Sequence, residues 1–163
     1  MPIANDRADM RVSKLFNTHS TNIFDYTQVE SVVLVNPVNC VGIMGAGLAL
    51  HFKERYPNNF ANYVSHCKKP GMRPGDILFF EEDEEEITIA NLATKDHWRH
   101  KSHIEYIHTG LLNLHAYCEE RANANVIMPK IGCGLGGLKW DDVRRLIVSV
   151  LKNSPANIFL LED

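Results

Sequence analysis

The chain has 163 residues, of which 45% are hydrophobic and 23% charged, and its formal net charge is -3 at pH 7. This length and composition are those of an ordinary globular protein with room for one well-packed domain. The small negative charge excludes a general polyanion-binding surface, so any contact with nucleic acid requires a local basic patch.

The chain opens with polar residues at 1–10, which we expect to be flexible. They lack the apolar centre of a signal peptide, and no apolar run approaches the length of about 20 residues needed to span a bilayer. The four cysteines form no CxxC pair, and their spacing does not indicate a secreted disulfide framework. We therefore expect a cytoplasmic monomer that makes no membrane contact, with residues 11–163 forming one domain.

Short apolar stretches predict strands in chain order at 12–17, 31–36, 77–81, 86–91, 125–129 and 157–161. The stretch SVVLVN at 31–36 is almost entirely apolar and mostly β-branched, which predicts a strand buried on both faces. The strands at 77–81 and 86–91 flank the acidic run 81–86, which predicts the solvated tip of an antiparallel hairpin.

Helices are predicted between these strands. Residues 47–56 follow a glycine-rich turn, and Pro57 suits the first position of the next helix. Ser102 and Glu105 predict a capping box at the start of a third helix, and the aspartates at 141–142 suit the first turn of a fourth. Alternating strands and helices with one hairpin predict an α/β fold, a three-layer α/β/α sandwich with a mixed sheet of six or more strands.

The densest functional signal is the stretch VNPVNCVGIMGAGLAL at 35–50. A buried strand ends near Asn36 and Asn39, a loop with several glycines follows, and then a helix begins. Glycine lets the backbone approach a ligand closely, and the amides at a helix start bind anions, which suits a diphosphate. The stretch matches neither a Walker A loop nor a GxGxxG fingerprint. The alternative is a tight turn between strand and helix that binds nothing.

A second glycine cluster, MPKIGCGLGGLKW at 128–140, also connects an apolar strand to a helix start. Ligands of α/β sheets bind beyond the carboxyl ends of the strands. We therefore expect the two loops to converge on one ligand.

Three motifs in this order, VNPVNCVGIMGAGLAL, NLATKDHWRHKS and MPKIGCGLGGLKW, resemble the macrodomain family. The closest likeness is to the branch that holds terminal ADP-ribose protein glycohydrolases and the DNA ADP-ribosyl glycohydrolase antitoxins opposing DarT-type toxins. The resemblance covers residues from about 12 to 161. It implies a macrodomain fold, ADP-ribose as ligand, no metal and no cofactor.

The resemblance implies roles for individual positions in the two loops. Asn39 would fix the distal ribose, and backbone amides of the two glycine loops would each hold one phosphate. Asn22 stands where the family usually has an aspartate that contacts adenine; an amide still accepts that hydrogen bond, and simple loop capping is the alternative. The predicted ADP-ribose contacts are Asn22, Ile23, Asn36, Asn39, Gly45, Ala46, Gly47, Thr94, Gly132, Cys133, Gly134, Leu135 and Gly136.

Catalysis is assigned by the same resemblance to Lys95, with Asn39 orienting the ribose. In this branch a lysine at the position of Lys95 acts on the anomeric carbon of the distal ribose, which requires an amine activated by burial or by neighbouring positive charge. The protein-directed glycohydrolases also use an aspartate in a GCGLD pattern, where this chain has Gly136. That departure favours the DNA-directed type, which likewise has glycine there.

The segment 95–101, KDHWRHK, combines positive charge with an aromatic ring. This mixture suits a phosphate backbone and a stacked base. We predict DNA contacts by His97, Trp98, Arg99 and Lys101, and the alternative is a surface turn with Trp98 packed inward. The histidines of this segment lack the carboxylate or cysteine that would complete a metal site.

Three functions remain open at this point. The first is hydrolysis of the bond between ADP-ribose and a DNA base, thymidine being the expected target, by an antitoxin with a DarT-like toxin as possible partner. The second keeps the pocket but acts on protein-linked ADP-ribose, O-acetyl-ADP-ribose or ADP-ribose-1″-phosphate. The third is a reader that binds ADP-ribose without cleaving it. Fold alone does not separate them.

Overall fold

The core of the structure is a mixed sheet whose strands are ordered β2-β3-β1-β4-β5. The computed structural model describes residues 20–162. The strands are β1 (Val32–Val38), β2 (Ile77–Glu82), β3 (Ile87–Ala93), β4 (Asn125–Met128) and β5 (Asn157–Leu160). All neighbours pair in parallel except β2, which runs antiparallel to β3 at the edge. The predicted sixth strand at 12–17 and the predicted flexible segment 1–10 lie outside the described residues.

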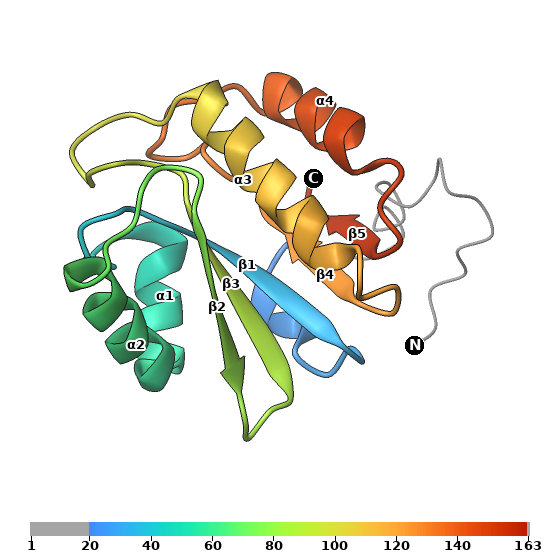
Figure 1. Cartoon of the computed structure of the whole chain (residues 1–163), viewed down its shortest axis with the longest axis horizontal. Coiled ribbons are helices and arrows are strands. Elements are labelled where there is room, and N and C mark those ends of the chain that lie inside the picture. Colours follow the sequence, from blue (N-terminus) through green and yellow to red (C-terminus); the bar gives the residue numbers. More distant parts are fainter. Residues whose placement is uncertain (1–19, 163) are drawn as a thin grey trace.

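Helices cover both faces of this sheet, which confirms the three-layer α/β/α sandwich (Figure 1). A short 3-10 helix, η3 (Ile23–Tyr26), precedes β1. The α-helices are α1 (Gly47–Arg55), α2 (Pro57–Lys68), α3 (Ile104–Cys118) and α4 (Trp140–Leu151). The first two pack on one face of the sheet and the last two on the other.

Strand β1 lies at the centre of the sheet, between β3 and β4, and both of its faces are buried. Val33 and Val35 pack into the core beneath α3 and α4, whereas Val32 and Leu34 pack into the core beneath α1 and α2. Successive side chains of a strand point to opposite faces, so a strand between two helical layers is apolar at most positions. This explains the uninterrupted run SVVLVN.

Three of the predicted helix starts are confirmed and one is wrong. Helix α1 begins at Gly47, as predicted. Pro57 opens α2, and Asp141 and Asp142 occupy the first turn of α4. The capping box at Ser102 is wrong, because α3 begins after His103 and no side chain caps it. The Ser102 hydroxyl instead donates a hydrogen bond to the backbone carbonyl of Thr94, at 2.6 Å.

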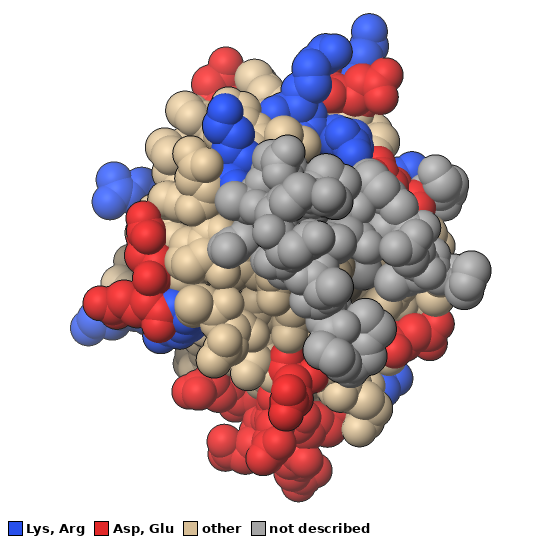
Figure 2. Space-filling view, turned by 90° about the vertical axis from the view of Figure 1, so that its right-hand side faces the viewer, with Lys and Arg blue, Asp and Glu red and all other residues tan. Residues whose placement is uncertain are grey.

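The acidic run 81–86 forms the end of β2 and the turn into β3, as predicted. Acidic side chains gather at the foot of the face in Figure 2, at the height of this hairpin in Figure 1. Because the turn precedes β3, it lies at the end of the sheet opposite to the carboxyl ends of β1 and β3. The negative charge is thus kept away from the edge where ligands of such sheets bind.

Two further findings concern the described residues. None of the helices within 20–162 is long and apolar enough to cross a membrane. All four cysteines fall in this part of the chain and are free thiols.

Candidate functional site

A cavity of about 860 Å³ lies where the central parallel strands end. Its walls come from three places: the loop between β1 and α1, the segment that follows β3, and the loop between β4 and α4. The two glycine loops therefore converge on one space, as their positions after parallel strands predicted. The volume is that of a small-molecule site rather than of a packing defect.

Most of the predicted ligand contacts line this cavity. They are Asn39, Gly45, Ala46, Gly47, Thr94, Lys95, Gly132, Cys133, Gly134, Leu135 and Gly136, together with Trp98 of the predicted DNA segment. Residues that sequence reasoning missed also line it, namely Pro37, Val38, Ile43, Leu48, Ala49, Pro129 and Lys130. Most of these are apolar neighbours of the motif residues, without a polar group to indicate a role.

The charge of the cavity wall is positive. Its charged side chains are Lys95 and Lys130, and no aspartate or glutamate is among the described residues that line it. Glycines of both loops line the same wall, where their backbone can approach a ligand closely. A wall of cations and glycine backbone without carboxylates is complementary to a diphosphate.

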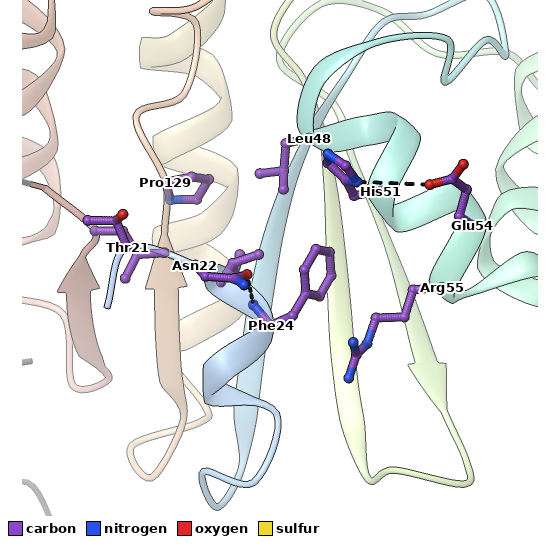
Figure 3. A pocket seen from close by; sticks show the side chains of 10 residues that line it. Thr21, Asn22, Phe24, Leu48, His51, Glu54, Arg55 and Pro129 are labelled. Carbon is purple, nitrogen blue, oxygen red and sulfur yellow. Dashed lines mark hydrogen bonds and ion pairs between the residues drawn. The ribbon is translucent and has the colours of Figure 1, made fainter. Parts of the chain in front are cut away.

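A second cavity of about 520 Å³ adjoins the first (Figure 3). Both share Leu48 and Pro129 in their walls, so the two cavities form adjoining parts of one groove. Phe24 of η3 and Arg55 of α1 lie on facing sides in Figure 3, and the Arg55 guanidinium sits 5.1 Å from the centre of the Phe24 ring. This end of the groove offers an aromatic face, apolar side chains such as Ile23 and Leu161, and the polar side chains of His51, Glu54 and Arg55.

Asn22 and Ile23, the predicted adenine-side contacts, line the second cavity. The side-chain oxygen of Asn22 accepts a hydrogen bond from the backbone N–H of Phe24 at 3.0 Å and so caps η3. An amide oxygen has two lone pairs, which leaves one for a ligand. Asn22 therefore lies in the wall of the second cavity, as predicted, and also caps η3.

Asn36 does not line either cavity, which corrects its prediction as a ligand contact. Its side chain is fully buried beneath the site and donates a hydrogen bond to the side-chain oxygen of Asn91 at 3.0 Å. Asn91 in turn pairs with Asn59 of α2. These buried amides join β1, β3 and α2, and a single sequence does not indicate that they meet.

Lys95 lies directly after β3, and its ammonium nitrogen donates to the backbone carbonyl of Trp98 at 3.2 Å. Two hydrogen bonds join the backbone of residues 95–96 to Cys40, which lies just after β1. The N–H of Cys40 donates to the carbonyl of Asp96 at 3.3 Å, and the Cys40 thiol donates to the carbonyl of Lys95 at 3.4 Å. Burial raises the pKa of this thiol to about 12, so it keeps the proton that it donates.

The predicted DNA-contact segment lies at the mouth of the cavity. Trp98 is 45% exposed, so the alternative in which it packs inward is wrong. The Arg99 guanidinium lies 4.7 Å from the centre of the indole, and the His97 ring is 5.2 Å away. His97, Arg99 and Lys101 line neither cavity, and only Trp98 of the four joins the wall itself.

Ser102 connects two of the three walls. Its hydroxyl binds the carbonyl of Thr94, and its N–H donates to the carbonyl of Gly136 at 3.0 Å. The second glycine loop passes so close to itself that a Cβ on Gly136 would lie 2.5 Å from the carbonyl oxygen of Gly132. The backbone therefore has no room for an aspartate at this position, which gives a physical reason for the departure from the GCGLD pattern.

We expect Gly136→Ala to lower the free energy of unfolding by about 2 kcal/mol, a fall in Tm of roughly 4–8 °C, because backbone atoms must move apart. Gly134→Ala is the matched control, since nothing lies within 4 Å of its Cβ position. Thermal melts of both variants check this. Equal Tm values would show that the close approach at Gly136 is not a constraint.

Comparisons with known proteins agree with this geometry. The family model described as Macro domain matches residues 35–147. A Mycobacterium tuberculosis protein named DNA ADP-ribosyl glycohydrolase is 39% identical over 133 residues, covering 80% of this chain and 38% of that protein. The solved macrodomain of Mycobacterium tuberculosis DarG has a TM-score of 0.78 and 35% identity, covering 87% of this chain and 93% of that one.

A third relative is a Thermosipho africanus protein named DNA ADP-ribosyl transferase-DNA ADP-ribosyl glycohydrolase fusion protein. It is 31% identical over 142 residues, covering 76% of this chain and 37% of that protein. A solved structure described as Thermosipho africanus DarTG in complex with ADP-ribose has a TM-score of 0.74 and 27% identity, covering 85% of this chain and 39% of that one.

The chain spans less than two fifths of the length of these two curated relatives. The match nevertheless includes both glycine loops and Lys95, which are the segments that build the cavity. A family model that covers most of the chain, a relative at 39% identity and a shared fold agree with one another. The chain belongs to the macrodomain family.

Proposed function

We propose that this chain binds ADP-ribose in the groove and hydrolyses the bond between its distal ribose and a modified DNA base. The observation that carries the proposal is the position of Lys95, at the wall of a cavity that the two glycine loops close from either side. The names of the relatives, DNA ADP-ribosyl glycohydrolase, support the same reaction.

The proposal assigns each part of ADP-ribose to a part of the groove. The diphosphate would lie between residues 45–47 and 132–136, where backbone amides and a carboxylate-free wall favour an anion. The adenosine would take the second cavity, against Phe24 and beside Asn22. The distal ribose would then lie at the other end, near Asn39 and Lys95.

Lys95 is proposed to act as the nucleophile. Its neutral amine would form a bond to the anomeric carbon while the bond from that carbon to the base breaks, and the base would leave with the electron pair. The proton that the amine loses neutralises the departing base, and water then releases ADP-ribose and restores the amine. This route needs no carboxylate, in agreement with a cavity wall that has Gly136 instead of aspartate.

The surface beside Lys95 supports DNA as the target. The DNA base linked to ADP-ribose would lie outside the cavity, next to Trp98. The indole of Trp98 is exposed, and the Arg99 guanidinium lies beside it. An exposed aromatic ring with adjacent positive charge suits a stacked base and a phosphate of a single strand. An ester of an acidic protein side chain offers no comparable flat surface.

We expect Trp98→Ala to lower kcat/KM on a thymidine-modified single-stranded oligonucleotide by about tenfold, the value of one stacked base. Leu112→Ala removes an equally exposed apolar residue from α3, away from both cavities, and is the control. Initial rates of ADP-ribose release measure both. A loss no larger for Trp98→Ala than for Leu112→Ala would mean that the indole makes no contact with the substrate.

A second candidate function is that of a reader, for which Gly136 in place of the aspartate leaves room. Wild-type protein should release ADP-ribose from the modified oligonucleotide faster than from an ester-linked modified protein, and chromatography of the products measures both. Protein that binds ADP-ribose but releases none from either substrate would be a reader. Faster release from the protein ester, or faster cleavage of ADP-ribose-1″-phosphate, would instead favour a hydrolase that acts on protein-linked or small ADP-ribose derivatives.

The partner, the cellular location and the oligomeric state of this protein are proposed as well. A DarT-like toxin is the partner that we propose, supported by the relative whose name joins a DNA ADP-ribosyl transferase to a DNA ADP-ribosyl glycohydrolase. The cytoplasmic location, the monomeric state and the lack of a cofactor or metal are proposed with it.

A further inference from the structure

The side chain of Asn39, at the end of β1, is almost fully engaged inside the protein. Its oxygen accepts from the backbone N–H groups of Val41 and Ile43, at 3.0 and 3.4 Å, and from the Tyr63 hydroxyl at 2.8 Å. Its nitrogen donates to the carbonyl of Ile43 at 2.7 Å. The amide thus holds the beginning of the first glycine loop.

These contacts fix which way the amide points. Three donors surround one end and a carbonyl faces the other, so exchanging the oxygen and nitrogen would place donors against donors. A primary amide nitrogen has two hydrogens, and the Ile43 carbonyl takes one of them. One N–H of Asn39 is therefore left for a ligand in the cavity that Asn39 lines.

The Tyr63 hydroxyl belongs to another element, helix α2, and contacts the Asn39 residue twice. It lies 2.8 Å from both the backbone oxygen and the side-chain oxygen of Asn39. Tyr63 is fully buried, and that burial raises the pKa of its hydroxyl, which therefore stays protonated as a donor. Tyr63 lines neither cavity itself.

Helix α2 is anchored to the sheet at a second point on the same face. Asn59 lies four residues before Tyr63 and is equally buried. Its side-chain amide exchanges hydrogen bonds with that of Asn91 in β3, at 2.8 and 3.3 Å. The paired amides hold the helix at a set distance from the sheet, so the hydroxyl of Tyr63 has little freedom to move away from Asn39.

We propose that Tyr63 is a positioning residue of the ADP-ribose site. Its hydroxyl holds the Asn39 amide so that the remaining N–H is available to a hydroxyl of the distal ribose. This rests on the function proposed above. It adds that ribose recognition depends on a buried hydroxyl from α2 that makes no contact with the ligand.

The test compares ADP-ribose with ADP, which has the same adenosine and diphosphate but no distal ribose. Tyr63→Phe keeps the ring and removes the hydroxyl. We expect calorimetry to show about tenfold weaker binding of ADP-ribose, the scale of one hydrogen bond, and unchanged binding of ADP. Tyr117→Phe is the control, because the Tyr117 ring of α3 stacks on Phe79 of β2 and Tyr117 lines neither cavity. We expect it to bind both ligands normally.

Combining the substitutions tests whether Tyr63 acts on ribose binding through Asn39. Asn39→Ala should weaken ADP-ribose more than ADP, because it removes the N–H left for the ribose as well as the contacts that hold the first glycine loop. Tyr63→Phe should add no further loss to it. Tyr63→Met is the second variant if Tyr63→Phe does not fold, because methionine also fills a buried position without a hydroxyl. Wild-type affinity for ADP-ribose in Tyr63→Phe, or equal losses for the two ligands, would overturn the positioning role. Wild-type protein that binds ADP but not ADP-ribose would overturn the proposed function as well.

Discussion

Lys95→Ala is expected to lose glycohydrolase activity by roughly a thousandfold or more while it still binds ADP-ribose, because only the reacting nucleophile is removed. Lys95 is partly exposed and donates a single hydrogen bond, to the carbonyl of Trp98, so its loss leaves the packing intact. An interaction made only in the transition state lowers turnover without weakening ground-state binding. ADP-ribose release from the modified oligonucleotide and calorimetry on the same sample measure the two effects.

Lys95→Arg separates nucleophilicity from charge. The guanidinium keeps the positive charge but stays protonated, so it cannot attack the anomeric carbon. We expect it to be as inactive as Lys95→Ala. Activity near the wild-type value in either variant would rule out a covalent role for this residue.

Gly134→Val is expected to weaken ADP-ribose binding on the order of a hundredfold or more and to leave a folded protein. No atom lies within 4 Å of the Cβ position of Gly134, so the side chain has space, and that space is the cavity itself. A side chain there keeps the diphosphate from the backbone amides of the second loop. Calorimetry gives the affinity, and a Tm near that of the wild type shows that the fold is intact.

Gly45→Val makes the same comparison in the first loop. Its Cβ would meet only the Ile43 side chain, at 3.4 Å, so the backbone need not move. Normal ADP-ribose binding in both variants would mean that the glycines serve the turns alone and that the ligand lies elsewhere.

The central strand was predictable from the sequence because it is buried on both faces. A strand between two helical layers is mostly apolar, and β1 therefore stands out as the run SVVLVN, within a residue or two of its bounds. The cavity was predictable for a related reason. Loops after parallel strands meet at one edge, and glycines there mark a close approach of backbone to ligand.

The buried polar residues that hold the site in place could not be predicted in the same way. Asn59, Tyr63 and Asn91 are polar residues buried at contacts between elements far apart in the chain, and polar residues are ordinarily predicted to lie at the surface. Ser102 was assigned to a helix cap because the local pattern fits one, whereas its hydroxyl binds the carbonyl of Thr94. Long-range hydrogen bonds leave no periodic signal in one sequence.

Calorimetric titration of wild-type protein with ADP-ribose shows whether the groove is a site for this ligand. Titrations with AMP and NAD provide the comparison, since AMP lacks the second phosphate and the distal ribose, and NAD has nicotinamide on the anomeric carbon beside Lys95. We expect saturable one-to-one binding of ADP-ribose, with both other ligands weaker, and a rise in Tm that grows with ADP-ribose concentration. No heat of binding and no rise in Tm with excess ADP-ribose would show that the groove is not an ADP-ribose site.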